Sequence, residues 1–272
     1  MERAAPPLLD GNHPVRDAVV EEFRRDGHCM VPGLASEAEV EQWRPLIERV
    51  AMEAAWDKRP LEERDTYGKA FLQSLNLWKV NSAIAQFSLA PRFASVAAQL
   101  LGVDAVRIYH DQALLKEPGG GPTPWHQDQY YWPLDTDRSV TMWMPLVDLP
   151  SEVGSMTFVS GSHLAGDLRG RAISDESDAE FAELVDSRGL PTATHGALGA
   201  GDATFHAGWT IHSAGANPSE VMRTVMTVIY VADGARVATD LSEARELDRM
   251  LWLGGAEPGE LIQSELNPVV WP

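Results

Sequence analysis

Residues 221–231 read VMRTVMTVIYV and carry the clearest β-strand signature in the chain, because β-branched side chains dominate the segment. Outward from this stretch, other short apolar segments alternate with turns rich in Gly and Pro. They are 203–209 (ATFHAGW), 156–161 (MTFVSG), 139–149 (SVTMWMPLVDL) and 105–117 (AVRIYHDQALLKE). Many short strands joined by such turns are typical of a β-sandwich or barrel, so we expect a mainly β fold.

The first hundred residues show helical patterns instead. Apolar side chains recur at helical spacing over 14–26. Ser36 and Glu39 form a capping-box signature that predicts a helix to about residue 57. Pro91 and Gly102 have the residue types that begin and end a helix. A short strand is expected at 28–34, and 58–75 is predicted to be helical in part.

We expect residues 1–272 to form a single domain, because no linker or internal repeat divides the chain. The predicted parts are a loose arm (1–13), a mainly helical support (14–102), a β core (103–237) and a C-terminal segment (238–272). Residues 170–195 are predicted to be an insertion in the core, helical over 175–188.

The composition excludes several classes of partner. The formal net charge of −18 repels nucleic acid and anionic membranes, so neither is expected as a partner. There is no run of ~18 apolar residues for a membrane span. The single cysteine, Cys29, cannot form an intramolecular disulfide, which suits a reducing cytoplasm. We therefore expect a cytoplasmic protein without a nucleic-acid or membrane partner.

A candidate metal half-site lies in 124–132, PWHQDQYYW. In an extended strand, residues two apart point to the same face, so His126 and Asp128 are expected to project together. One imidazole and one carboxylate suit a hard or borderline divalent ion. Tyr130 would share this direction if the strand continued, which makes it a candidate substrate contact.

The second half of the site is predicted in 206–223, HAGWTIHSAGANPSEVMR. If the hairpin formed by this segment faces the strand of His126 across a barrel, His212 completes a facial triad. Such a triad favours Fe(II) and leaves three coordination positions open. His206 is the rival for this role, but it lies seventeen residues before Arg223 rather than eleven.

Arg223 suggests a dicarboxylate co-substrate. A 2-keto acid would chelate iron through its keto oxygen and C1 carboxylate, and its far carboxylate would then need a buried partner. The guanidinium fork offers paired, charge-assisted hydrogen bonds of the right shape. A zinc hydrolase would not need this arginine.

These motifs resemble the phytanoyl-CoA dioxygenase family of Fe(II)/2-oxoglutarate oxygenases. The similar stretches are WHQDQYYWPLD (125–135), MWMPLVD (142–148), GSMTFVSGSH (154–163) and GDATFHAGWTIHSAGANPSEVMR (201–223). The resemblance implies a double-stranded β-helix, that is, a jelly-roll or cupin-like core, with N-terminal helices against one sheet. It also implies Fe(II) as the metal and 2-oxoglutarate and O₂ as co-substrates.

The resemblance assigns roles residue by residue. It implies that His126, Asp128 and His212 are the metal ligands and that Arg223 binds the distal carboxylate of 2-oxoglutarate. Further co-substrate contacts are expected from Trp143, Lys79 and Ser213, although Ala214 stands where some members have a serine. Related halogenases have a small residue in place of Asp128, so oxygen chemistry is favoured here.

The expected substrate is a neutral or apolar small molecule, such as a natural-product scaffold. Its candidate contacts are Gln112, His110, Tyr130 and Trp209, whereas Lys116 is expected to be an exposed residue at the end of a strand. Hydroxylation is the first expectation. Epimerisation, cyclisation, desaturation and acyl-CoA hydroxylation are alternatives, as are a non-oxidative metal-binding isomerase or hydrolase and a non-catalytic binding module.

Overall fold

The protein is described here by a computed structural model that covers residues 5–168 and 173–272. Residues 1–4 of the predicted arm and 170–172 of the predicted insertion therefore lie outside the described residues. No helix in the described ranges is long and apolar enough to cross a membrane.

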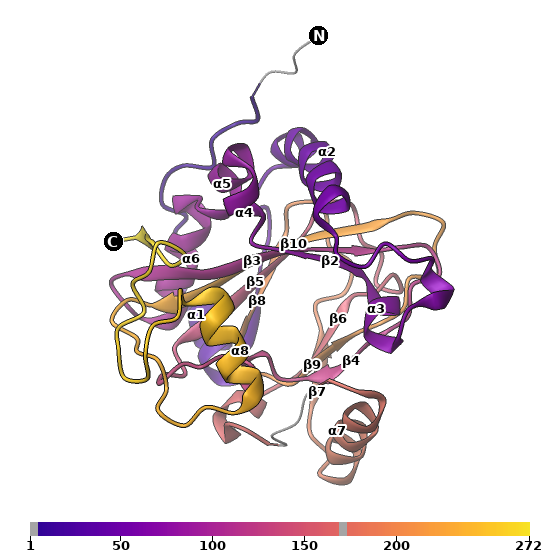
Figure 1. The fold of residues 1–272 in the computed structure, drawn as a ribbon. Coiled ribbons are helices and arrows are strands. Elements are labelled where there is room, and N and C mark those ends of the chain that lie inside the picture. Colours follow the sequence, from indigo (N-terminus) through magenta and orange to yellow (C-terminus); the bar gives the residue numbers. More distant parts are fainter. Residues whose placement is uncertain (1–4, 169–172) are drawn as a thin grey trace.

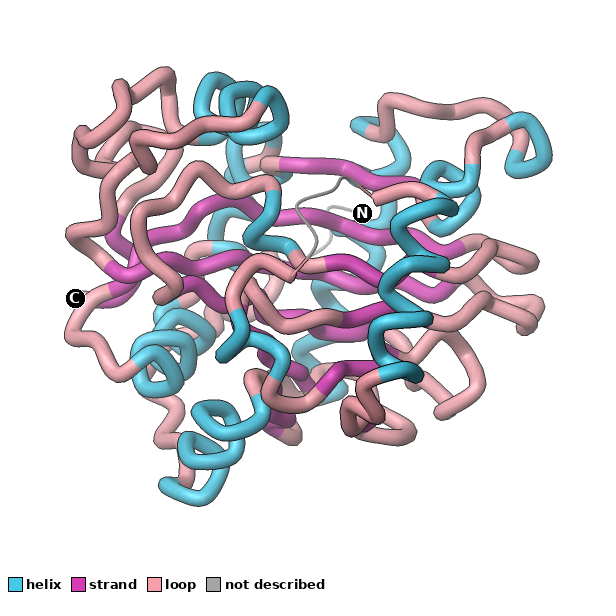
Figure 2. Tube along the Cα trace, turned by 90° about the horizontal axis from the view of Figure 1, so that it is seen from below, coloured by secondary structure: helices cyan, strands magenta, loops and turns pink. Residues whose placement is uncertain are grey.

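The larger of two antiparallel sheets is built around the segment with the clearest strand signature. Its strands run in the order β1 (His28–Val31), β8 (Ala203–Ala207), β5 (Ser139–Pro145), β10 (Arg223–Ala232), β3 (Val106–Lys116) and β11 (Val269–Trp271), with β2 (Leu72–Leu75) also on β3. β10 is buried along its whole length, and β3 and β5 pair with it on either side. Figure 2 shows these strands side by side.

The smaller sheet carries the strands β4 (Thr123–His126), β9 (His212–Ala214), β6 (Met156–Val159) and β7 (Thr192–Thr194), in that order. Residues from both sheets line one cavity, so the sheets face each other across it (Figure 1). Two facing antiparallel sheets supported by helices confirm the predicted mainly β, jelly-roll fold class.

Helices cover the outer faces of the sheets. Among the N-terminal helices, α1 (Asp17–Asp26) packs on β1, α2 (Glu37–Ala54) on β2 and β3, and α6 (Pro91–Leu101) on β3, β5, β10 and β11. Between them lie η1 (Leu61–Glu63), α3 (Thr66–Ala70), α4 (Leu77–Val80) and α5 (Ser82–Ser88). The smaller sheet is covered by α7 (Asp175–Ser187), which contacts β4. The rest are η2 (Asp128–Tyr130), η3 (Ser162–Ala165) and α8 (Glu243–Trp252).

Local sequence patterns predicted most of the longer helices and strands correctly. Ser36 and Glu39 form the predicted reciprocal capping box at the start of α2, and Gly102 ends α6 in the left-handed conformation. β7, near the end of the predicted insertion, was not predicted as a strand. Neither were two further strands: β2, within a stretch expected to be partly helical, and β11 in the C-terminal segment. Both are short and complete the second edge of β3, so their conformation depends on pairing with a distant segment.

Candidate metal and co-substrate site

Three side chains from two distant segments of the chain converge between the sheets. His126, the last residue of β4, pairs across the strands with His212 of β9, and their ring centroids are 4.1 Å apart. Oδ1 of Asp128 lies 3.4 Å from Nε2 of His126 and 3.7 Å from Nε2 of His212. One ligand atom from each residue falls within a group no wider than 4.8 Å. Side chains this close can hold one ion.

Backbone carbonyls orient both imidazoles of the triad. Nδ1 of His126 donates to the carbonyl of Pro124 at 2.8 Å, and Nδ1 of His212 donates to that of Thr210 at 2.9 Å. With the proton on Nδ1, the lone pair of each ring lies on Nε2, the atom that faces Asp128. The tautomer that can ligate a metal is therefore set by the fold.

The protonation states at the site also suit metal binding. Burial, together with the neighbouring imidazoles of His126 and His206, lowers the pKa of His212 well below its usual value. Burial alone would raise the pKa of Asp128, but the surrounding imidazoles outweigh burial and hold it well below the usual range. Two imidazoles and one carboxylate are the donor set that non-haem Fe(II) prefers.

The second oxygen of Asp128 is held from the larger sheet. Nε2 of His206 donates to Oδ2 at 3.1 Å, and the hydroxyl of Thr141 donates to the same atom at 3.0 Å. His206 and Thr141 are paired across β8 and β5, which places both donors on one side of the carboxylate. His206, the rival for the third ligand position, thus lies behind Asp128 and outside the His126–Asp128–His212 group.

We expect His206→Ala to weaken iron binding by about tenfold, because partners of a ligand that fix its orientation typically contribute 10- to 100-fold in metal affinity. Anaerobic titration with Fe(II) would measure the change. His206→Gln keeps a donor amide and should restore part of the affinity. Unchanged iron affinity in the alanine variant would show that His206 only fills space.

The triad opens into a cavity of about 430 Å³, a size suited to small molecules. Arg223, at the start of β10, lines the cavity and is almost fully buried. Nη1 of Arg223 donates to the carbonyl of Gly154 at 2.7 Å. Its guanidinium carbon lies 5.4 Å from the centroid of the Trp143 ring. Among the described residues, its Nε has no hydrogen-bond partner. Burial lowers its pKa to about 9, so it stays cationic at neutral pH.

A buried guanidinium normally has an anionic partner. Within the described ranges, no carboxylate lies within ion-pair distance of Arg223, and a buried N–H is left unpaired. These features fit an anion that enters the cavity. The residues present thus suit both iron and a dicarboxylate.

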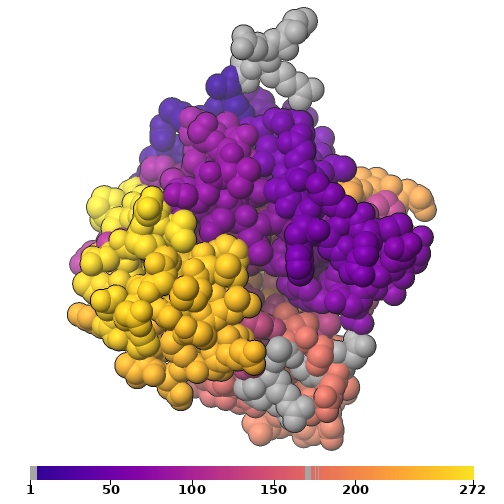
Figure 3. Space-filling view, viewed as in Figure 1, coloured from indigo at the N-terminus to yellow at the C-terminus, as the bar shows by residue number. Residues whose placement is uncertain are grey.

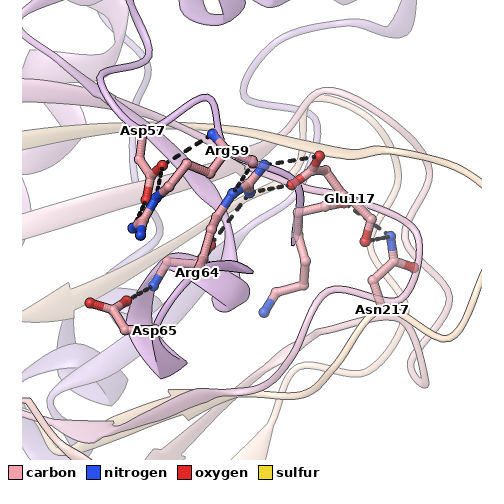
Figure 4. Close-up of polar contacts among 8 residues, drawn as sticks. Asp57, Arg59, Arg64, Asp65, Glu117 and Asn217 are labelled. Atoms are coloured by element: carbon pink, nitrogen blue, oxygen red, sulfur yellow. Dashed lines mark hydrogen bonds and ion pairs between the residues drawn. The ribbon is translucent and has the colours of Figure 1, made fainter. Parts of the chain in front are cut away.

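A polar network joins the segment before α3 to the end of β3 (Figure 4). The buried side chain of Arg64 contacts the carboxylate of Glu117 just after β3, and its Nε donates to the carbonyl of Arg59. The amide of Asn217 donates to the carbonyls of Lys116 and Glu117. The network ties the chain around α3, which supplies Tyr67 and Phe71 to the cavity, to the end of β3.

Lys116 is not the exposed strand-end residue that was expected. It is fully buried, and its ammonium donates to the carbonyl of Gly121. Burial and then the charge of Arg223 lower the pKa of Lys116 to about 7. The end of β3 is covered by the segment around Asn217 rather than open to solvent, which explains the difference.

The other predicted contacts divide into two groups. Trp143, Ser213, Gln112 and His110 line the cavity. Lys79 does not: it lies in the outer helical layer, with Nζ 4.0 Å from Oε2 of Glu265. Trp209 is also outside the lining and lies beside the guanidinium of Arg245.

Tyr130 was placed in the cavity on the assumption that the strand of His126 continues. β4 ends at His126, and Asp128–Tyr130 forms a 3-10 turn, so the alternation of side chains stops there. Tyr131 lines the cavity instead. Asp128 still reaches His126 because the turn begins at Asp128 itself.

Sequence reasoning missed the contribution of the C-terminal segment. Asp248, Leu251 and Trp252 of α8 line the cavity, and so does Ile173 at the described edge of the insertion. The helical spacing of the three α8 residues was visible in the sequence, but not which surface the helix covers. In Figure 3 the C-terminal segment, in yellow, lies beside the purple N-terminal part of the chain on the same face of the molecule.

Comparisons with known proteins agree with this site. The family model described as "Phytanoyl-CoA dioxygenase (PhyH)" matches residues 23–225. An ectoine dioxygenase of Stutzerimonas stutzeri (strain A1501) is 25% identical over 241 residues, which cover 80% of this chain and 78% of that protein.

Solved structures with the same fold include two enzymes of nogalamycin biosynthesis. The carbocyclase SnoK, described as non-haem and α-ketoglutarate-dependent, is 25% identical with a TM-score of 0.76, and the match covers 97% of this chain and 98% of that one. The epimerase SnoN, in complex with Fe³⁺, α-ketoglutarate and nogalamycin RO, is 28% identical with a TM-score of 0.75, covering 93% of this chain and 98% of that one.

Proposed function

The chain belongs to the phytanoyl-CoA dioxygenase family of Fe(II)- and 2-oxoglutarate-dependent oxygenases, and we propose that it oxidatively tailors a small molecule of the natural-product kind. One observation carries the proposal. A His–Asp–His group and a buried arginine, which has no acidic partner among the described residues, share a single cavity. The similarity to a carbocyclase and an epimerase that act in nogalamycin biosynthesis supports the substrate class.

In this proposal His126, Asp128 and His212 hold Fe(II) through two Nε2 atoms and a carboxylate oxygen. When bound there, iron supplies oxygen activation coupled to the oxidative decarboxylation of 2-oxoglutarate to succinate and CO₂. Asp128 leaves one positive charge on the metal, and Arg223 adds another. Together they balance the two negative charges of 2-oxoglutarate, so the loaded site is electrically neutral.

Arg223 is proposed to bind the distal carboxylate of 2-oxoglutarate. Its unpaired Nε and its remaining N–H groups can donate two parallel bonds, while Gly154 holds Nη1 in place. A Cβ on Gly154 would lie 2.8 Å from that nitrogen, so glycine is required for the close approach. Trp143 packs beside the guanidinium, and Ser213 lies on the strand of His212.

The substrate would occupy the part of the cavity between the triad and α8. Aromatic side chains from several elements line the cavity: Tyr67, Phe71, Tyr131, Trp132 and Trp252. They exclude water and offer flat apolar surfaces, which suits an extended organic scaffold. Thr141 and His206 keep Asp128 fixed while the substrate is oriented beside it.

Anaerobic addition of Fe(II) and 2-oxoglutarate to the purified protein tests the proposal. We expect a weak visible absorption band from the chelate, and succinate formation when O₂ is admitted. Both follow from bidentate binding of the keto acid to iron in a site anchored by Arg223.

A correctly folded protein that gives neither the band nor O₂-dependent succinate would falsify the oxygenase assignment. It would favour the alternative of a metal-binding isomerase or hydrolase on the same scaffold. Exposed Asp240 provides a matched control, because Asp240→Ala removes an acidic group that lines no part of the cavity.

A further inference from the structure

The cavity has a polar corner that neither the metal nor the co-substrate accounts for. It is formed by Asp248 and Trp252, one helical turn apart on α8, and by His110 on β3. The His110 ring lies 5.3 Å from the Trp252 ring between centroids. We call Asp248, Trp252 and His110 the α8 corner.

The α8 corner lies within reach of the metal site. His110 pairs with Ile229 on β10, and Ile229 pairs with Thr141 on β5. Two steps between neighbouring strands span about 10 Å. Thr141 donates to Asp128, so a molecule about 10 Å long can touch both the corner and the metal site.

Among the described residues, the hydrogen-bond partners of Asp248 are neutral groups. The hydroxyl of Tyr109 donates to its Oδ2 at 2.8 Å, and the Trp252 side chain is a second hydrogen-bond donor. Burial raises the pKa of Asp248 to about 6, which these two bonds only partly offset. Within the described ranges, no cationic side chain acts on this carboxyl.

The basic side chains nearest to Asp248 either bond to other groups or carry no charge. Arg245, one turn earlier on α8, donates to the carbonyls of Tyr130 and Gln129. His110 is buried, and burial lowers its pKa to about 4, so it carries no charge at neutral pH. In the described part of the chain, its Nδ1 has no hydrogen-bond partner of good geometry. Within the described ranges, the corner thus holds a carboxyl group without a counter-charge and a buried ring nitrogen without a hydrogen-bond partner.

We propose that the α8 corner binds a protonated amine of the substrate, with Asp248 as its anionic partner. This inference rests on the proposed function, since it names the feature by which the substrate is held for oxidation. Charge-assisted hydrogen bonds to a carboxylate are about twice as strong as neutral ones. The aromatic walls around the corner, including Trp252 and Tyr131, attract cations through their ring faces. The net charge of −18 also concentrates cations near the protein.

Two probes of matched shape test the inference: 2-phenylethylammonium, which is cationic, and 2-phenylethanol, which is neutral. Isothermal titration calorimetry on the full chain with Fe(II) and 2-oxoglutarate, under anaerobic conditions at pH 7.5, would give both affinities. We expect the ammonium to bind at least ~10-fold more tightly than the alcohol, because only the cation gains a charge-assisted bond.

Asp248→Asn is expected to abolish this preference, since the amide keeps the shape and removes the charge. Glu243→Gln, in the exposed first turn of the same helix, makes the same change of charge and should preserve the preference. Equal affinities of the two probes for the wild type, no binding of either, or a preference that survives Asp248→Asn would each overturn the inference.

The absorption band of the chelate, recorded in the same samples, separates the two proposals. If the band forms but the ammonium has no advantage, only the α8 corner assignment fails. If the band is missing from folded protein, the oxygenase assignment fails, whatever the probes show.

Discussion

Replacing Asp128 with alanine is expected to lower the rate of succinate formation by at least ~1,000-fold and to remove the absorption band of the chelate. Asp128 is the only carboxylate in the group that faces Nε2 of both His126 and His212. Without it the site keeps only two imidazoles, which hold a divalent ion poorly at these positions. Loss of the metal removes oxygen activation altogether.

Succinate assays and anaerobic titration with Fe(II) would check this result, with circular dichroism to show that the variant is folded. The control Asp240→Ala should behave like the wild type. A rate within tenfold of the wild type in folded Asp128→Ala protein would mean that another group binds the metal.

Arg223→Ala is expected to raise the KM for 2-oxoglutarate by about 100-fold or more, while the affinity for Fe(II) changes by less than about threefold. The substitution removes a pair of charge-assisted bonds to the distal carboxylate, and such bonds to charged groups contribute about 1.5–3 kcal/mol each. The metal ligands lie on β4, β9 and the turn after β4, so their geometry does not depend on the guanidinium.

The measurement compares the KM for 2-oxoglutarate with the dissociation constant of Fe(II) in the same preparations. Arg223→Lys keeps a charge and should show an intermediate KM, because a single ammonium lacks the planar fork. The exposed Arg138 offers a control through Arg138→Ala. If both constants rose equally, Arg223 would have only a structural role.

The sequence allowed the elements of the core to be predicted because their signals are local. β10 contains a run of β-branched residues, and the start of α2 has its reciprocal capping pair. β2 and β11 have no such signal, since each is short and is ordered by the edge of β3. Their conformation follows from tertiary pairing, which periodicity does not record.

The candidate site could be predicted in part for the same reason. The spacing of His126 and Asp128 and the distance from His212 to Arg223 are properties of the chain itself. The prediction for Tyr130 depended on where a strand stops, and the prediction for Lys116 depended on what covers the end of a strand. Both predictions were wrong. The role of Asp248 depended on how a helix near the C-terminus packs, which no motif records.

The metal site and part of the substrate cavity are built from different elements, so substitutions can change one without the other. Reaction chemistry depends on hydrogen-bonded strands, where almost any replacement disturbs several partners at once. Ligand preference depends partly on one ten-residue helix near the C-terminus, whose inward side chains can mutate while the β-scaffold stays intact. Substitutions on α8 can therefore change which substrate is bound while the metal and co-substrate site stays the same.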